Sequence, residues 1–134
     1  VLPEDFIVTD KKFSKQPEAK LINQVGKEDV IVDIGPQTRM LFYKEILNTH
    51  TVLWNGPLGL FEKPPFNQGT EFVMKSIKAN KNKNFFSVAG GGDTISILNQ
   101  SKCFKDFTFV STGGGAFLEF VQGSIMPGLT SLND

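Results

Sequence analysis

The sequence predicts an α/β fold, in which a partial and mainly parallel sheet is flanked by helices. Short apolar runs alternate with longer segments of helical periodicity along the 134 residues. This alternation is typical of consecutive βα units. Two of the expected strand-to-helix junctions also contain three consecutive glycines, and open α/β sheets bind their ligands at such junctions.

The apolar runs place five strands, at residues 6–9, 30–33, 51–54, 85–89 and 107–111. The second, third and fourth runs are almost continuously apolar, as expected for strands covered on both faces. Four helices are expected between and after them. They begin at Pro36, which suits a first helical turn, at Asn67 or Thr70, either of which could cap a helix, after Asp93, and after Gly115.

The composition argues against nucleic acid and membranes as binding partners. The formal net charge is zero, so no global field draws the chain to nucleic acid or to an anionic membrane. No apolar run is long enough to cross a bilayer, and no signal-peptide pattern opens the chain. Cys103 is the single cysteine, which forbids an internal disulfide. These features fit a cytoplasmic protein, in which any phosphate binding must come from a local arrangement of residues.

The two glycine triplets, residues 90–92 and 113–115, are the main candidates for a ligand site. Glycine lets the backbone approach a ligand closely, and the helix start beyond each triplet leaves amide hydrogens unpaired. This combination binds anions, most often phosphate. One such triplet is more often a simple tight turn. Two triplets at successive strand ends favour a phosphate site.

Asp93 directly follows the first triplet. A carboxylate beside a phosphate repels it unless a cation lies between them, and Mg²⁺ accepts oxygen ligands from both. The alternative is that Asp93 caps the following helix, and the two roles do not exclude each other.

A third segment, residues 54–62, runs from the end of an expected strand into a loop rich in glycine and proline. Asn55 offers amide donors to phosphate oxygens, Glu62 could accept hydrogen bonds from ribose hydroxyls, and Pro57 gives a rigid apolar surface. A purely structural loop is an equally good interpretation. Asp33 either faces the same crevice or caps a turn.

Taken together, these segments resemble phosphoglycerate kinase. The resemblance spans the whole chain, but only about the last third of a family member. Val1 and the residues after it also read as mid-chain sequence, which indicates that something precedes them, or else as a processed terminus. With the resemblance, we expect a fragment. The matching segments, in the order and spacing of the family, are residues 33–36, 54–62, 66, 69–70, 90–94, 111–119 and 123–129.

The resemblance implies that residues 1–134 are the C-terminal part of a nucleotide-binding domain, a three-layer Rossmann-like parallel sheet with flanking helices. The family's N-terminal domain, which holds 3-phosphoglycerate, is absent. The implied reaction is reversible phosphoryl transfer between 1,3-bisphosphoglycerate and ADP, giving 3-phosphoglycerate and ATP in glycolysis, with Mg²⁺ as cofactor. A full-length member is implied to be monomeric.

Carried over residue by residue, the resemblance makes Asp93 a ligand of Mg²⁺. The amides of the two turns face the transferring phosphoryl group, Asn55 faces the nucleotide phosphates, and the remaining residues contact ribose or adenine. The expected site comprises Val32 (adenine), Pro57 and Glu62 (ribose), Asn55, Gly90, Gly91, Gly92, Asp93, Thr94, Gly114 and Gly115.

The family's glycine- and lysine-bearing nucleotide loop is also missing. We therefore expect the 134-residue chain alone to be inactive or nearly so, with weak nucleotide binding at most. Two alternatives stay open. The chain is a nucleotide-binding module without turnover, or it is a structural or interaction piece that folds only beside a partner half.

Overall fold

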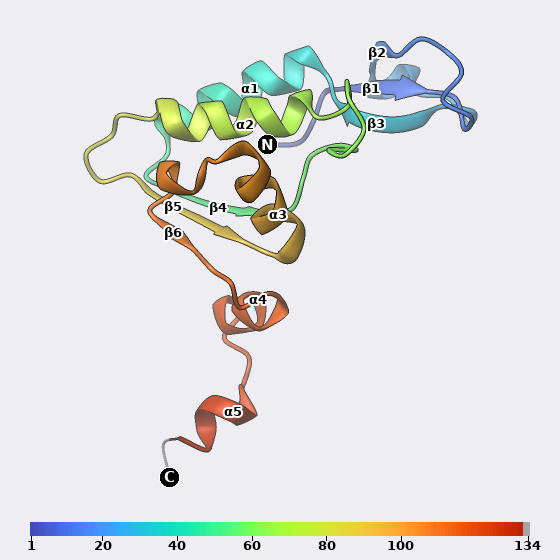
Figure 1. The fold of residues 1–134 in the computed structure, drawn as a ribbon. Helices are drawn as coiled ribbons and strands as arrows, with labels where there is room; N and C mark the ends of the chain where they lie inside the picture. Colours follow the sequence, from blue (N-terminus) through green and yellow to red (C-terminus); the bar gives the residue numbers. More distant parts are fainter. Residues whose placement is uncertain (133–134) are drawn as a thin grey trace. The chain divides into compact units, whose positions relative to one another are not determined.

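The computed structural model describes residues 1–132, which belong to two compact units (Figure 1). Unit 1 contains Val1–His50 and Pro57–Phe85, and unit 2 contains Thr51–Gly56 and the chain from Phe86 onward. No helix among the described residues could cross a membrane. The longest, with 13 residues, spans about 20 Å, well short of the ~30 Å hydrocarbon core.

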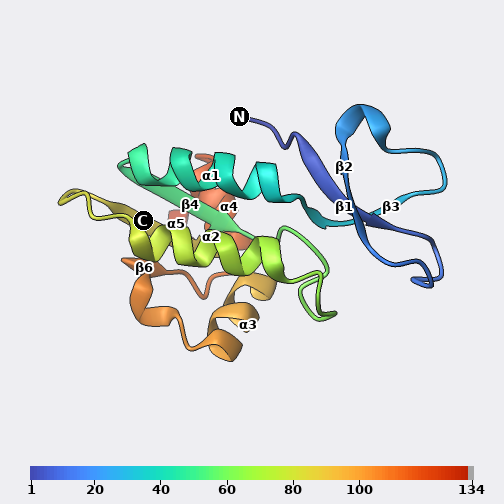
Figure 2. The same cartoon turned by 90° about the horizontal axis from the view of Figure 1, so that it is seen from above.

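Unit 1 contains a three-stranded antiparallel sheet in the order β2-β1-β3 (Figure 2). Its strands are β1 (Asp5–Thr9), β2 (Glu18–Leu21) and β3 (Val30–Ile34), and the short helix η1 (Ile22–Gln24) follows β2. The sequence placed β1 and β3 but missed β2, and it did not reveal that β1 and β3 pair antiparallel in a sheet of their own. These two strands therefore lie outside the parallel sheet.

Two helices complete unit 1 and lie side by side (Figure 2). The first, α1 (Pro36–Asn48), begins at the predicted proline, and the second, α2 (Gln68–Ala79), has Asn67 as its N-cap. An edge-to-face contact between Tyr43 and Phe72 joins them, with ring centroids 6.0 Å apart. The buried apolar side chains of this unit include Val8, Val32, Ile34, Val73 and Ile77.

Asp5 fastens β1 to the start of α1. Its buried carboxylate accepts hydrogen bonds from the backbone N–H groups of Gln37 (3.0 Å) and Thr38 (2.7 Å) and from the Thr38 hydroxyl (2.7 Å). These bonds satisfy donors that a helix start leaves unpaired. Burial opposes ionisation of Asp5, but the hydrogen bonds from Thr38 and Gln37, with the charge of Arg39, lower its pKa below the ordinary 3.8.

We expect Asp5→Asn to lower the free energy of unfolding at neutral pH by about 1–3 kcal/mol, because the amide NH₂ faces backbone donors that need an acceptor. The lowered pKa makes the unfolded chain bind the proton more readily. This part of the stability is therefore present above about pH 4 and is lost as the pH falls through the folded pKa.

Urea unfolding at several pH values measures this effect, with Glu45→Gln on the exposed face of α1 as the control. The difference between the wild type and Asp5→Asn should shrink steadily on acidification, while the control stays at the wild-type value. A difference that is independent of pH would contradict the assigned role of the ionised carboxylate.

Unit 2 contains a three-stranded parallel sheet in the order β4-β5-β6. Its strands are β4 (Thr51–Asn55), β5 (Phe86–Gly90) and β6 (Phe109–Val110), the last shorter than predicted. Helix α3 (Gly92–Ser101) contacts β5, and η2 (Phe104–Asp106), α4 (Gly115–Val121) and α5 (Pro127–Thr130) follow along the chain. This sheet confirms the predicted α/β class with a parallel sheet.

The expectation that the apolar strands are covered on both faces is not met. Ile31 of β3, Leu53 of β4 and Phe86 of β5 are 50%, 44% and 45% exposed, respectively. On the parallel sheet, Leu53 and Phe109 flank the buried Val88 in register and leave an apolar strip. No described segment covers these side chains fully, which is why continuous apolar runs here do not mean burial.

Candidate functional site

Both glycine triplets lie at the same edge of the parallel sheet. Because β5 and β6 run parallel, residues 90–92 and 113–115 both follow the carboxyl ends of their strands. The pairing continues past β6, where the N–H of Ser111 donates to the carbonyl of Ala89 (2.8 Å). Asn55 ends β4 and pairs with Gly90. The sheet thus brings Asn55 and both predicted turns to one edge.

The first turn requires glycine at position 91 for two reasons. Gly91 has a φ of +94°, in the region that glycine tolerates best. A Cβ on Gly91 would also lie only 2.5 Å from Oδ1 of Asn55. The amide oxygen of Asn55 therefore lies directly against the first turn.

Thr94 contributes a side-chain contact that the sequence did not predict. Its hydroxyl accepts a hydrogen bond from the N–H of Gly56 (2.6 Å), and its side chain is completely buried. The first turn of α3 thereby fixes the backbone just after Asn55. A threonine in a first helical turn is too common a feature to reveal such a contact, since its partner lies 38 residues away in the sequence.

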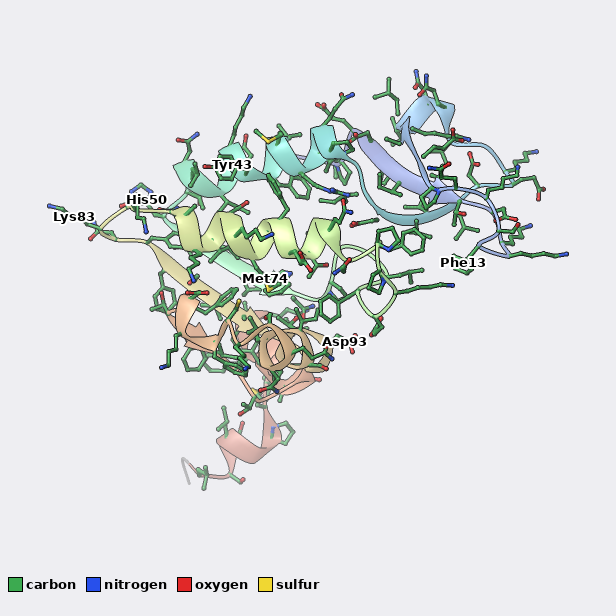
Figure 3. The ribbon with its side chains drawn as sticks, turned by 45° about the horizontal axis from the view of Figure 1, so that its top comes forward. Phe13, Tyr43, His50, Met74, Lys83 and Asp93 are labelled. Carbon is green, nitrogen blue, oxygen red and sulfur yellow. The ribbon has the colours of Figure 1, made fainter. Side chains whose placement is uncertain are left out.

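The start of α3 presents backbone donors without a side-chain cap. Its N-cap residue is Gly91, which has no side chain to offer, and helix geometry leaves the first N–H groups without internal partners. Asp93 lies in the first turn and is exposed (Figure 3). Asp93 is therefore not the N-cap, and the capping alternative does not explain its presence here.

The donor set fits Mg²⁺ only if a phosphate completes it. Residues 1–132 contain no group of three or more His, Cys, Asp or Glu side chains that could hold a metal ion. Asp93 would thus be a single protein ligand. That is the usual arrangement for Mg²⁺, which takes one or two carboxylates together with water and substrate phosphate oxygens.

The second turn leaves open space at its surface. Gly114 has a φ of +56° and precedes α4, and the N–H of Gly113 donates to the hydroxyl of Ser111 (3.3 Å). A Cβ added at Gly92 or Gly115 would meet no atom within 4 Å, and neither residue has a positive φ. In both turns, therefore, neither packing nor backbone geometry explains why glycine occupies the last position, at residue 92 in the first turn and residue 115 in the second.

The loop after β4 belongs to unit 1 from Pro57 onward, and it is fastened there by backbone groups. The N–H of Leu58 donates to the Thr70 hydroxyl (3.0 Å), and the N–H of Leu60 donates to the carbonyl of Val32 (2.9 Å). Pro57 is half-buried, and Glu62 is exposed. These bonds bring Val32 to the loop that carries Pro57 and Glu62.

The side chain of Val32 is only 1% exposed. Within unit 1, it packs in the core, and its carbonyl holds the loop through Leu60. The adenine contact expected for Val32 stays a prediction.

The carboxylate of Asp33 caps the start of helix α2 and also accepts a hydrogen bond from the neighbouring residue in the chain. Its buried carboxylate accepts the N–H of Gly69 (2.7 Å) and of Ile34 (2.8 Å) and lies 3.4 Å from the guanidinium of Arg39. Burial raises the pKa of Asp33, although the hydrogen bonds and the charge of Arg39 oppose this. Gly59 fits beside it, since a Cβ there would lie 2.7 Å from Oδ1 of Asp33.

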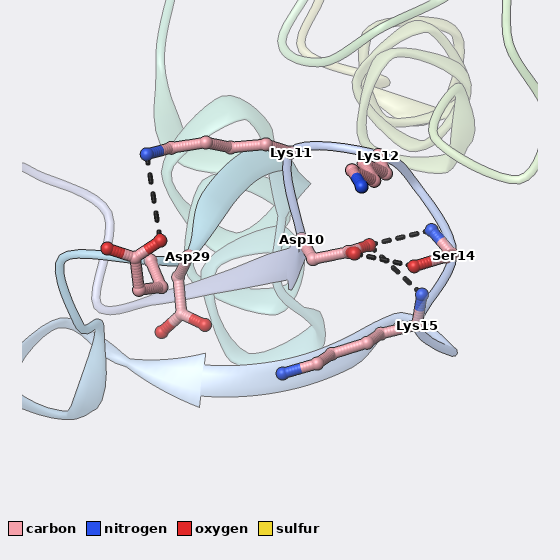
Figure 4. A pocket seen from close by; sticks show the side chains of 7 residues that line it. Asp10, Lys11, Lys12, Ser14, Lys15 and Asp29 are labelled. Atoms are coloured by element: carbon pink, nitrogen blue, oxygen red, sulfur yellow. Dashed lines mark hydrogen bonds and ion pairs between the residues drawn. The ribbon is translucent and has the colours of Figure 1, made fainter.

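An open pocket of about 540 Å³ lies at the turn between β1 and β2 (Figure 4). None of the predicted site residues lines it. Asp10 there accepts hydrogen bonds from the N–H and hydroxyl of Ser14 (both 2.6 Å) and from the N–H of Lys15 (3.0 Å), which lower its pKa to about 2. Lys11 pairs with Glu28 (3.6 Å). Asp10 therefore closes the turn through its own hydrogen bonds, and Glu28 and Asp29 line the pocket from outside the turn.

The parallel sheet with glycine turns at its carboxyl edge defines an α/β protein of the kind that binds ligands at that edge. The model of the phosphoglycerate kinase family matches residues 1–124. The chain therefore belongs to the phosphoglycerate kinase family, which confirms the resemblance found in the sequence.

Individual relatives agree with the family match. A phosphoglycerate kinase of Azorhizobium caulinodans is 43% identical over 135 residues, covering 98% of this chain and 34% of the relative. The solved phosphoglycerate kinases of Coxiella burnetii and Pyrococcus horikoshii have TM-scores of 0.84 and 0.78, with 36% and 32% identity. They match 93% and 98% of this chain, and in each case 32% of their own. The chain thus spans about a third of the length of these relatives.

Proposed function

We propose that this chain supplies part of the Mg-nucleotide site of a phosphoglycerate kinase, which transfers a phosphoryl group reversibly between 1,3-bisphosphoglycerate and ADP. The observation that carries the proposal is the pair of glycine turns at one sheet edge, with open space at Gly92 and Gly115. Phosphate oxygens occupy such space when backbone amides are to contact them closely.

The chain's own groups act by position and by charge. The amides of residues 92–94 and of Gly114 and Gly115 donate to phosphate oxygens, and Asn55 adds its side-chain amide. Thr94 keeps the strand end at Gly56 in place. Phosphoryl transfer depends mainly on such alignment and on electrostatic stabilisation of the transferring oxygens. Mg²⁺, held by Asp93, would supply positive charge there.

In unit 1, we propose that Pro57 and Glu62 contact the ribose and that Val32 borders the adenine. The support is the family resemblance together with the bonds that fix this loop at Leu58 and Leu60.

The chain is proposed to be the C-terminal part of the nucleotide-binding domain, and to have little or no kinase activity alone. By the family resemblance, we propose that the substrate's basic cluster and the lysine-bearing nucleotide loop belong to the other two thirds of a full-length member. By the same resemblance, we propose a glycolytic, cytoplasmic enzyme that is monomeric at full length.

A non-catalytic nucleotide-binding module is the second candidate. The same observation supports it, because the two glycine turns at one sheet edge need only bind the nucleotide and do not by themselves require turnover. Both candidates bind Mg-ADP, and only the first requires that restoring the remaining two thirds of the polypeptide give kinase turnover.

Calorimetric titration of the chain with ADP, with and without Mg²⁺, tests the proposed site. We expect Asp93→Asn to weaken binding of Mg-ADP about tenfold, or ~1.4 kcal/mol, while ADP without Mg²⁺ is little affected, because only the Mg-dependent part uses the carboxylate. Glu119→Gln, an exposed change on α4, should leave both affinities unchanged.

If Asp93→Asn bound Mg-ADP with the wild-type affinity, Asp93 would not be a ligand of Mg²⁺. Absence of binding by the wild-type chain would overturn the proposed function of the isolated chain.

A further inference from the structure

The ring of Phe117 lies against the α-carbon of Gly90. A Cβ added to Gly90 would lie 2.5 Å from Cδ1 and 2.6 Å from Cε1 of this ring. Gly90 is buried at the end of β5 and begins the first glycine turn. Glycine at this position is thus explained by one aromatic neighbour rather than by its backbone angle.

Phe117 lies in the first turn of α4, two residues beyond the second glycine triplet. Its own N–H donates to the carbonyl of Gly114 (3.2 Å). The contact with Gly90 therefore joins the second turn to the first. The backbone bond from Ser111 to Ala89 (2.8 Å) also connects these segments, next to the β5–β6 pairing.

The first turn has further neighbours within unit 2. Oδ1 of Asn55 would lie 2.5 Å from a Cβ on Gly91, and the hydroxyl of Thr94 holds Gly56 (2.6 Å). Consecutive glycines lose more conformational freedom on ordering than other residues. Backbone amides bind an anion well only when they are ordered before the ligand arrives.

We propose that Phe117 is a positioning residue, whose ring holds Gly90 and thereby orients the amides of residues 92–94 toward the phosphates of the nucleotide. This inference rests on the proposed function, because it concerns the same Mg-ADP site. Phe117 itself is not expected to touch the nucleotide.

Titrations with adenosine and with Mg-ADP separate positioning from a general structural role. Phe117→Ala should lower the affinity for Mg-ADP at least tenfold and change the affinity for adenosine less than twofold, because only the phosphates use the first turn. Phe117→Leu, which keeps an apolar contact, should recover part of the loss. Phe120→Ala on the same helix, where Phe120 is 63% exposed, should leave both affinities unchanged.

A double variant tests the contact itself. Gly90→Ala places a methyl group where the ring lies, so it should lower Mg-ADP affinity strongly. Adding Phe117→Ala removes the obstruction, and the double variant should bind no worse than Phe117→Ala alone.

Equal losses for adenosine and Mg-ADP, wild-type affinity in Phe117→Ala, or strictly additive effects in the double variant would each overturn the inference. A wild-type chain that fails to bind Mg-ADP would instead overturn the proposed function, on which the inference rests.

Discussion

Gly92→Ala and Gly115→Ala are expected to lower the affinity for Mg-ADP at least about tenfold without lowering the free energy of unfolding. Outside its chain neighbours and its own helix backbone, the added methyl group meets no atom within 4 Å at either position, and neither φ is positive. Alanine is preferred over glycine in helices by up to ~1 kcal/mol, so stability should stay unchanged or rise slightly. The loss of binding follows because the methyl group occupies space proposed for phosphate oxygens.

Thermal unfolding and calorimetric titration of the same samples measure both effects. Gly128→Ala is the matched control, because Gly128 also lies in a first helical turn, at α5, with open space around it. It should keep wild-type affinity. Unchanged binding in both Gly92→Ala and Gly115→Ala would indicate that the triplets are only tight turns.

Asp33→Ala is expected to lower the free energy of unfolding of unit 1 by about 3 kcal/mol. The change leaves the N–H of Gly69 without its acceptor and removes the carboxylate beside the largely buried guanidinium of Arg39. Unsatisfied buried donors cost about 1–3 kcal/mol each. The loop that carries Pro57 and Glu62 should also loosen, because Gly59 packs beside Asp33.

Urea unfolding measures this loss, and Glu28→Gln provides the comparison. Glu28 pairs with Lys11 on the surface, with side chains 88% and 70% exposed, and such pairs contribute at most ~1 kcal/mol. If Asp33→Ala costs no more than Glu28→Gln, then the buried carboxylate does not hold α2 in place.

The sequence predicted the parallel strands and their glycine turns because both are local patterns. Apolar runs mark β4 and β5, and glycine triplets mark the junctions beyond β5 and β6. The sequence of β2, Glu-Ala-Lys-Leu, alternates polar and apolar residues, but it is only four residues long and contains no β-branched or aromatic side chain. This strand forms because β1 offers it an edge to pair with. Likewise, the antiparallel direction of β1 and β3 depends on pairing between segments rather than on either segment alone.

The sequence predicted which residues belong to the candidate site, but it did not predict which of them contact one another in the folded chain. Family motifs pointed to Asn55, Asp93 and the glycines, and the parallel sheet of unit 2 brings these to one edge. The contacts of Thr94 with Gly56 and of Phe117 with Gly90 join segments that are far apart in the sequence. Contacts between residues so far apart in the sequence cannot be predicted from a local sequence pattern. The open space at Gly92 and Gly115 is likewise a property of the folded chain.

The most direct measurement is the change in backbone amide chemical shifts of the isotopically labelled chain as Mg-ADP is added. The amides of residues 92–94 and those of Gly114 and Gly115 should shift together, with one dissociation constant, because both turns contact the same polyphosphate. Shifts at only one of the turns, or shifts concentrated at the opposite end of the parallel sheet near Phe86, would contradict a shared phosphate site.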